Sequence, residues 1–533
     1  MKKTTILVLS AFAVAMAARS QSAIDAYQLA QPDFKGTARY MSMGGAFGAL
    51  GGDVSTLNNN PGGIGVYRSS DIAFTLDINM MSTKTESSGQ SFNNDRTKVY
   101  VNNFGYVGSA KTGSSLMPVF NWGASYSRVK SFDRAYHGAL PSMGTSLTNY
   151  VAGYTSGQWS QQELYGPVDG YNPYKNSYAP WMSVLFYNSC LINPQNAASS
   201  NYSGLYRDGA VVNGEFDVIE KGYVDEYSIN LGGNFVDMVY WGIGFGITDI
   251  SYTSDTYYSE SVSNTRVPQK GASGFVDGSG AYALRSLKHI SGSGFNFKAG
   301  VIVKPINELR LGLAVSTPTY YSLSQEGQAY TSYSYSSGLE GVNVTNNNNP
   351  DYFRWKFNTP WRLIASVAGV IGSKGIISMD YEYQPYNKMT VKDDSGRNYT
   401  DIDNDIKDYY QASSILRVGG EYKVIPMLAL RAGYSYQSSP VKSAAYHGEL
   451  PVYTAGPDDT ETQPSYSMDN TIQHITLGLG LRVKRFYADA AYVHTMRESE
   501  FRPFTPGSEA GTPPASKITD SNNSIVLTVG YKF

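Results

Sequence analysis

Alternation of apolar and polar side chains is the strongest pattern in this chain, and it is clearest at the C-terminus. Between Ile525 and Phe533 every second residue is apolar or aromatic, and most of the residues between them are polar or small. A side-chain period of two predicts a β-strand with one apolar face. The segment is also about as long as a tilted strand that crosses a bilayer. An edge strand that ends a soluble β-sandwich is the open alternative.

The same alternation returns upstream in hairpins whose two strands are joined by short turns. Four such turns lie at residues 304–308, 372–375, 424–427 and 484–485. Longer polar segments separate the hairpins and occupy residues 318–352, 387–410, 437–470 and 495–522. Short turns at one end and long loops at the other are typical of a transmembrane β-barrel. Counting alternating stretches from residue 72 onward, we expect an all-β, antiparallel barrel of about fourteen strands. With an even number of strands, the first strand begins and the last strand ends on the same side of the membrane.

Two regions depart from this alternation. Residues 21–70 precede the first expected strand and contain a glycine-rich stretch at 43–52. Residues 131–215 form the longest insertion, in which short helices are expected at 145–154 and 178–191. A connection of that length is usually a functional lid or a binding loop.

The second of these helical segments carries a cluster of large apolar side chains. Its members are Trp181, Met182, Leu185 and Phe186. One interpretation is that they cover the mouth of the barrel and form a low-affinity capture site for a ligand. Packing of a loop helix against its neighbours explains the same residues, and the sequence leaves both interpretations open.

Strand parity assigns charged side chains to the inside of the barrel. If Leu363, Met379, Leu416 and Leu430 face lipid, their neighbours of opposite parity face the lumen. The charged residues at such positions are Arg310, Arg362, Asp380, Glu382, Arg417, Glu421, Arg431 and Arg482. We expect them to form a ladder of ion pairs that holds the barrel and its N-terminal region together. The alternative hypothesis is that Arg431 or Arg482 binds the carboxylate of a ligand.

Composition and charge agree with a membrane barrel and narrow the function. Charged residues make up 16% of the chain and the mean hydropathy is −0.31, which suits strands with alternating faces and argues against a polytopic helical membrane protein. The net charge of −2 comes without a basic block, so nucleic acid is not an expected partner. Cys190 is the only cysteine and the five histidines never stand at ligand spacing, so we expect no metal site and no cofactor. Because no nucleophile motif occurs, we expect no catalytic residue and no enzyme.

Residues 1–20 have the pattern of a secretory signal peptide. Two lysines precede an apolar run from Ile6 to Ala18, and small residues follow, with cleavage expected near Ser20. No later apolar stretch reaches the roughly 18 residues that a transmembrane helix needs. We therefore expect export to the outer membrane of a Gram-negative cell, where lipid surrounds the barrel. The terminal aromatic Phe533 resembles the signal by which barrel-assembly machinery recognises such chains.

A more specific pattern follows the glycine-rich stretch, where Asp53, Ser55, Asn60 and Pro61 form an Asp-x-Ser-x-x-x-x-Asn-Pro segment. This arrangement resembles the FadL/TodX family of outer-membrane hydrophobic-compound transporters. The family's Asn-Pro-Ala signature matches Asn60, Pro61 and Gly62, and Gly62 departs from the usual alanine. Further matching segments lie at 300–305, 309–312, 359–361 and 380–383. The resemblance thus covers most of the mature chain.

The resemblance implies a fourteen-stranded barrel at residues 71–533 with a small plug, the hatch, formed by residues 21–70 inside its lumen. It implies passive uptake of hydrophobic small molecules such as long-chain fatty acids, by movement of the plug and lateral release through a gap in the wall. That gap is expected at the third strand, where Pro118 and Gly123 weaken pairing. We expect a monomer. The alternative function is a barrel-anchored adhesion or structural protein with ligand-binding loops, and the cargo is left open.

Overall fold

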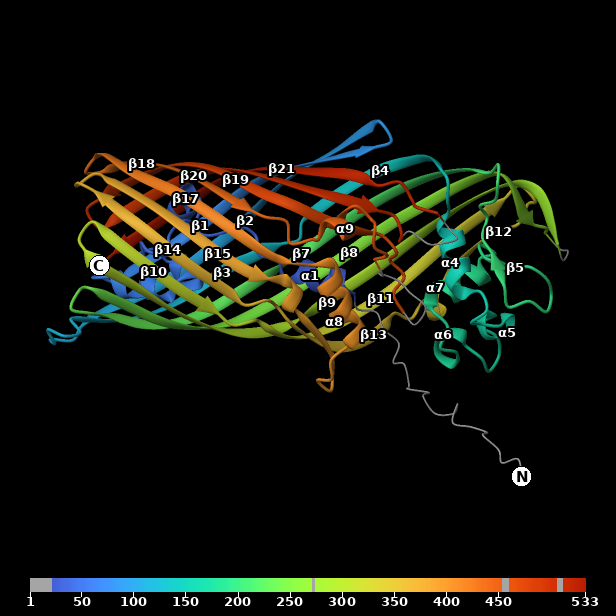
Figure 1. The fold of residues 1–533 in the computed structure, drawn as a ribbon, viewed down its shortest axis with the longest axis horizontal. Helices are drawn as coiled ribbons and strands as arrows, with labels where there is room; N and C mark the ends of the chain where they lie inside the picture. The colour runs from blue at the N-terminus through green and yellow to red at the C-terminus, as the bar shows by residue number, and fades with distance from the viewer. Residues whose placement is uncertain (1–21, 271–273, 453–459, 506–510) are drawn as a thin grey trace, which may run out of the picture.

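The computed structural model describes residues 22–270, 274–452, 460–505 and 511–533. In it the chain forms a closed antiparallel β-barrel with fourteen strand positions, so the predicted all-β barrel is confirmed (Figure 1). The wall closes where β1 (Asp71–Ser87) pairs with β21 (Ser516–Lys532), from Asp71 opposite Lys532 to Glu86 opposite Lys517. The predicted signal peptide lies outside the described residues.

Ten wall positions consist of one strand each, and four are divided between two strands. The undivided strands are β1, β2 (Gln90–Lys111), β7 (Val211–Phe235), β8 (Val239–Pro268), β9 (Phe275–Ile306), β17 (Ala412–Ile425), β18 (Leu428–Gln437), β19 (Tyr466–Val483), β20 (Phe486–Arg502) and β21. The divided positions are β3 (Val119–Ser131) with β4 (Arg134–Met143), β10 (Leu309–Ser316) with β11 (Tyr320–Tyr335), β13 (Asp351–Asn358) with β14 (Arg362–Ile371), and β15 (Gly375–Pro385) with β16 (Thr390–Asp393). The short strands β5 (Asn193–Pro194) and β6 (Tyr202–Ser203) form a separate two-stranded sheet, and β12 (Glu340–Val344) pairs with the end of β11.

The outer face of the wall carries an apolar belt. Leu363, Met379, Leu416 and Leu430 are all exposed on it, as strand parity predicts. Their neighbours of opposite parity point inward, and many of these neighbours are buried polar residues. An apolar exterior around a polar interior is the architecture of multi-pass outer-membrane barrels. The chain is therefore an outer-membrane β-barrel.

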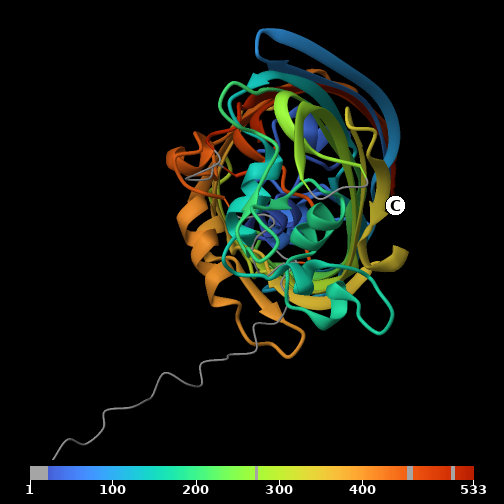
Figure 2. The same ribbon diagram turned by 90° about the vertical axis from the view of Figure 1, so that its right-hand side faces the viewer.

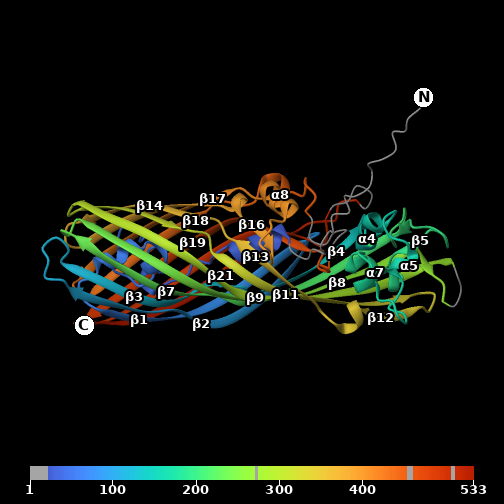
Figure 3. The same ribbon diagram turned by 90° about the horizontal axis from the view of Figure 1, so that it is seen from below.

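The two ends of the barrel differ. Short turns and the C-terminus lie at one end, and the long connections lie at the other (Figure 3). The predicted loops are nevertheless too long, because β11 and β12 occupy much of residues 318–352 and β20 continues into 495–522. These strands pass beyond the apolar belt, where outward residues such as Ser322 and Glu326 are polar and exposed. Their outward faces therefore lack the apolar side chains that mark a membrane-crossing strand.

Residues 144–210 form a cap at the end with the long connections, and Figure 2 shows its helices lying across the barrel mouth. The cap contains α4 (Leu147–Thr155), α5 (Gln161–Leu164), α6 (Pro173–Asn176) and α7 (Trp181–Asn188). It is shorter than the predicted insertion at 131–215, because β4 and β7 take up both of its ends. The other helical segments on this side are η2 (Thr345–Asn348), η3 (Tyr386–Lys388), α8 (Thr400–Tyr409) and α9 (Ser443–Tyr446). Among the described residues, no helix is both long and apolar enough to cross a membrane.

The predicted capture residues lie in the interior of the cap. Trp181 is 4% exposed, and Met182, Leu185 and Phe186 are fully buried in an apolar core that the cap shares with the wall strands. The ring of Phe186 meets Tyr282 of β9 edge to face, with 5.9 Å between ring centroids. An open capture site formed by these four residues is therefore wrong for this conformation, because α7 packs them against its neighbours.

Truncation of Phe186 should loosen the cap. We expect Phe186→Ala to destabilise it by about 3–5 kcal/mol, because a fully buried ring is lost and a cavity is left. Tyr178→Ala is the matched control, since Tyr178 lies in the same cap and is 80% exposed; its effect should stay within about 0.5 kcal/mol. Limited proteolysis of residues 144–210 measures the difference, and equal cleavage rates for both variants would contradict the buried placement.

The N-terminal residues 22–70, which we call the plug, lie inside the barrel (Figure 1, blue). They form α1 (Ala23–Ala30), α2 (Ala38–Ser42), α3 (Thr56–Asn59) and the 3-10 helix η1 (Pro61–Val66). Ser22 caps α1 and Thr37 caps α2, because each hydroxyl accepts a backbone N–H of the first turn. Such short helices are not stable alone, and burial against the wall holds them in place.

Candidate functional site

The predicted motif builds the tightest turn of the plug. Asn60 caps η1, since its Oδ1 accepts the N–H of Gly62 at 2.9 Å and its Nδ2 donates to the carbonyl of Gly48 at 2.5 Å. Pro61 occupies the first turn of η1, a position where its missing N–H costs nothing. Asp53 accepts the hydroxyl of Thr37 at 2.8 Å. The motif thus holds separate parts of the plug together.

Glycine is required at position 62 for a steric reason. A Cβ at Gly62 would lie 2.9 Å from the backbone of Gly300 and Val301 in β9. A Cβ at Gly300 would come even closer to the side-chain oxygen of Asn60. The plug and the wall therefore approach backbone to backbone, which only glycine allows.

Charged and backbone groups attach the plug to the lumen wall. Lys35 donates to Asp77 of β1 at 2.6 Å, and Arg39 donates to Glu421 of β17 at 3.2 Å. The N–H of Gly48 donates to Asp380 at 2.8 Å. Arg310 donates to the carbonyl of Leu50 at 2.8 Å. Arg362 donates to Asn59 at 3.3 Å. Four of the predicted lumen residues are therefore partners of the plug, namely Asp380, Glu421, Arg310 and Arg362.

The predicted charges also pair with one another across the wall. Arg362 donates to Glu382 at 2.6 Å, and Arg417 forms an ion pair with the same carboxylate at 2.7 Å. Arg431 donates to Glu421 at 2.7 Å and to Asp489 at 2.5 Å. The pairs of Glu382 and of Glu421 join neighbouring wall strands, since β15 pairs with both β14 and β17, and β17 pairs with β18. The pair of Arg431 with Asp489 passes over β19, which lies between β18 and β20. The structure thus brings these predicted charges together as a buried ladder.

Arg482 is the exception. Its side chain is exposed, and its backbone N–H donates to the carbonyl of Met427 near the short turns. Side-chain parity assigns Arg482 to the inner face, but it cannot show that β19 extends beyond the plug at this residue. The sequence prediction also missed four charged residues. Asp489 in β20 and Asp77 in β1 could have been found by the same parity rule. Lys35 and Arg39 lie outside the strands, so no strand pattern marks them.

Helix α1 has its own set of buried polar partners at the other end of the plug. Lys288 of β9 donates to Asp25 at 2.7 Å and to Glu461 at 3.1 Å. Tyr27 donates to Asp469 at 3.1 Å, and burial raises the pKa of its hydroxyl well above the usual range. Tyr27 also stacks on Tyr410, with 4.8 Å between ring centroids. The plug is therefore attached at both ends.

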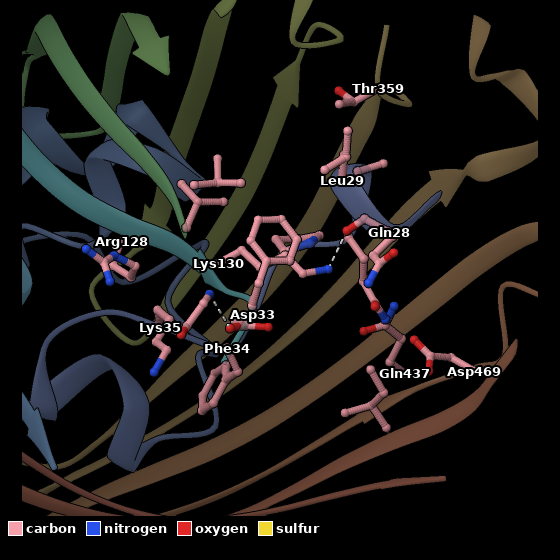
Figure 4. Close-up of a pocket in the computed structure, with 18 of the residues that line it drawn as sticks. Gln28, Leu29, Asp33, Phe34, Lys35, Arg128, Lys130, Thr359, Gln437 and Asp469 are labelled. Carbon is pink, nitrogen blue, oxygen red and sulfur yellow. Dashed lines mark hydrogen bonds between the residues drawn. The ribbon is translucent and has the colours of Figure 1, made fainter. Parts of the chain in front are cut away.

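Between these attachments lies an internal cavity of about 300 Å³, a size within the range of small-molecule sites. Residues 27–36 of the plug form one side, and lumen-facing residues of the wall form the other (Figure 4). Nine cationic side chains line it, namely Lys35, Arg128, Lys130, Arg134, Lys288, Lys298, Arg362, Arg417 and Arg497. The six carboxylates are Asp25, Asp33, Asp133, Glu220, Glu226 and Asp469. The lining therefore has an excess of positive charge.

Arg417 has unused hydrogen-bonding capacity at this cavity. Its side chain is 8% exposed, and one nitrogen forms an ion pair with Glu382. The Nε and Nη1 atoms are buried and find no acceptor among the described residues. Because buried N–H groups without a partner are costly, these atoms favour an additional acceptor at the cavity.

Strand pairing in the wall is interrupted beside the cavity. β2 pairs with β3 from Lys111 opposite Val119 to Asn103 opposite Ser127, and the register ends there. β3 continues along β7 with an irregularity between Arg128 and Lys130, and β4 then pairs with β7. The free edge of β2 therefore faces residues 128–134 across a gap in the pairing. Beside this gap, the tip of the β1–β2 hairpin projects outward from the wall (Figure 1, blue).

Pro118 and Gly123 do not interrupt the wall. Pro118 lies in the turn before β3, and Gly123 stands opposite Val107 on one side and Asn230 on the other. The pairing ends within the predicted third strand, after Ser127, and away from these two residues. β3 separates from β2 only after Ser127. Further along the chain, β4 lies near the end of β1, where the hydroxyl of Ser87 donates to the carbonyl of Ala139 at 2.6 Å.

Comparisons with known proteins identify the fold. No protein-family profile and no curated protein matches the chain. Among solved structures, a FadL homologue from Pseudomonas aeruginosa superimposes with a TM-score of 0.51 and 13% identity, over 94% of this chain and 99% of that one. The toluene transporter TodX from Pseudomonas putida gives a TM-score of 0.46 and 13% identity, over 94% and 98% of the two chains. The chain therefore has the fold of the FadL homologue, as the resemblance in its sequence implies.

Proposed function

We propose that the protein is a passive outer-membrane channel that takes up hydrophobic small molecules with an anionic head, such as long-chain fatty acids. The observation that carries this proposal is the cavity, which lies between a plug that fills the lumen and a gap in the wall. An ion channel would need a continuous aqueous path, and the buried contacts of the plug oppose one. A ligand that reaches the cavity has the adjacent gap as a short route into the membrane.

The polar lining of the cavity supports an acidic ligand over a neutral hydrocarbon. A carboxylate beside Arg417 would accept from one of the two unpartnered groups, Nε–H or Nη1–H, and charge-assisted hydrogen bonds of this kind are the strong ones. Apolar side chains that line the same cavity, such as Leu29, Phe34 and Val129, would contact the chain of the ligand. In this proposal the ladder charges Arg431 and Glu421 hold the wall and plug, since both are already paired.

Replacement of Arg417 by lysine tests the ligand class. Arg417→Lys keeps a positive charge beside Glu382 but removes the two unpartnered N–H groups. Loss of charge-assisted bonds worth about 1.5–3 kcal/mol should weaken palmitate binding roughly tenfold to a hundredfold. Toluene binding should stay unchanged. Arg397→Lys is the control, because Arg397 is exposed in a loop pair with Asp393.

Native mass spectrometry of the full chain in mild detergent measures this binding and shows what co-purifies with it. Palmitate affinity that is equal in the wild type and Arg417→Lys would contradict the acidic ligand class. A barrel that only anchors adhesive loops should bind neither palmitate nor toluene in its lumen, so the same measurement separates the two functions.

We also propose that barrel-assembly machinery recognises the C-terminal strand through Phe533. The ring of Phe533 is half exposed and stacks on Tyr531 with 5.9 Å between centroids. Phe533→Ala should slow assembly while leaving the folded barrel intact, because the contact of this ring with the wall is small. Pulse-chase labelling in cells measures the rate at which folded barrel appears. Tyr531→Ala tests whether loss of the ring stack alone explains slower assembly.

A further inference from the structure

An apolar groove opens on the lipid-facing side of the wall. It spans β15, β17, β18, β19 and β20 and has a volume of about 1020 Å³, which is as large as the largest small-molecule sites. Its sides are large apolar side chains exposed on the outer face, among them Ile377, Tyr422, Leu430, Leu477, Leu479 and Tyr492. Membrane lipid is therefore the medium that reaches this groove.

Two small residues form the floor of the groove. Gly420 of β17 stands opposite Ala432 of β18, and this pair lies between Ile377 of β15 and Leu477 of β19 in the sheet register. A Cβ at Gly420 would meet only the carbonyl oxygen of Ile376, at 3.5 Å. Close packing within the wall therefore does not require glycine here, and the space outside it is open to a ligand.

A cationic patch lies on three neighbouring short turns at one end of these strands. Residues 371–375, 422–428 and 481–486 contain five basic residues and no acidic one. All five are exposed and, among the described residues, none of them forms an ion pair; they are Lys374, Lys423, Arg482, Lys484 and Arg485. A cluster of unpaired charges of one sign favours an anionic partner.

The patch and the groove are continuous. The backbone N–H of Lys423 donates to the carbonyl of Lys374 at 2.8 Å, and that of Arg482 donates to the carbonyl of Met427 at 2.8 Å, so the three turns adjoin one another. Lys374 itself lines the groove. Because the short turns of outer-membrane barrels face the periplasm, the patch lies at the level of the lipid headgroups of the periplasmic leaflet.

We propose that the groove and the cationic patch together bind an anionic phospholipid of the periplasmic leaflet. One acyl chain lies over Gly420 and Ala432, and the headgroup phosphate accepts from Lys374 and Lys423. Basic clusters at a membrane surface attract anionic headgroups, whereas phosphatidylethanolamine offers the same chains without a net charge. The site lies outside the lumen, so it stands independently of the proposed uptake.

Native mass spectrometry of the delipidated full chain in detergent tests this site with phosphatidylglycerol and phosphatidylethanolamine of identical acyl chains. We expect the wild type to bind phosphatidylglycerol more tightly. Lys374→Gln should weaken phosphatidylglycerol binding roughly fivefold, the effect of about one charge near a membrane surface, and should reduce the preference. Gly420→Leu/Ala432→Leu should weaken the binding of both lipids, because the new side chains fill the groove and leave the patch intact.

Lys111→Gln is the matched control, because Lys111 is also an exposed lysine at the end with the short turns but does not line the groove. Only variants that keep the heat-modifiable mobility of a folded barrel are compared. The site is wrong if Lys111→Gln weakens phosphatidylglycerol binding as much as Lys374→Gln does, or if the groove-filling variant binds both lipids like the wild type. Loss of the lipid preference in Arg417→Lys would place the lipid in the lumen and overturn the proposal. A groove-filling variant that turns a dimer into a monomer without changing lipid binding would show that a second copy covers the groove, which also overturns it.

Discussion

Deletion of residues 22–65 should convert the closed barrel into an open pore, with single-channel conductance rising from background to large, steady steps. The plug occupies the lumen and is attached to the wall at Lys288 and at Glu421, so its removal should leave a water-filled path. The wall should survive, because Glu382 keeps its ion pairs with Arg362 and Arg417 in the deletion, and Arg362 loses only its 3.3 Å hydrogen bond to Asn59. Planar-bilayer recordings of the purified variant measure the effect.

A second variant guards this prediction against a deletion that assembles poorly. Lys35→Ala/Arg39→Ala keeps the whole chain and removes two ion pairs between plug and wall, so it should show brief openings. Arg397→Ala, in an exposed loop pair, should remain closed. If the deletion variant folds correctly and still shows only background conductance, the assignment of residues 22–70 as a plug is wrong.

Replacement of Glu382 by alanine should cause the largest loss of stability of any single substitution in the lumen. Glu382 is fully buried and accepts from both Arg362 and Arg417. Removing one partner of a buried ionic group costs about 3–5 kcal/mol, because the remaining charges lose their compensation. Here two guanidinium groups lose it together.

The exposed pair of Asp393 and Arg397 provides the comparison, since Arg397 is 85% exposed. Asp393→Ala should cost no more than about 1 kcal/mol, as solvent-exposed ion pairs do. Urea unfolding in lipid vesicles measures both variants. Similar midpoints for Glu382→Ala and Asp393→Ala would show that the ladder does not hold the wall.

Much of the barrel could be predicted from side-chain parity. The strands around Leu363, Met379, Leu416 and Leu430 have one face in lipid, so the sequence alternates visibly and their inward neighbours could be assigned to the lumen. Asp380, Glu382 and Arg417 were found in this way. The steric need for Gly62 could not be predicted, because it depends on the close approach of β9, which is distant in the chain.

The features missed by the sequence depend on long-range register. β11 continues past the membrane belt, where water contacts its outward face and the apolar alternation ends. The gap in the wall begins after Ser127 because β4 leaves β2, and no residue type near Pro118 or Gly123 reveals that change of partner. Lys35 and Arg39 carry no motif, since their importance comes only from the wall residues that they contact.

Uptake of palmitate by Gram-negative cells that lack their own long-chain fatty-acid channel tests the central claim most directly. Cells that express the full chain should accumulate labelled palmitate well above cells with an empty vector, and Arg417→Lys should lower the rate at equal amounts of folded barrel. Equal accumulation with and without the chain would contradict the account of this barrel as a channel for hydrophobic acids.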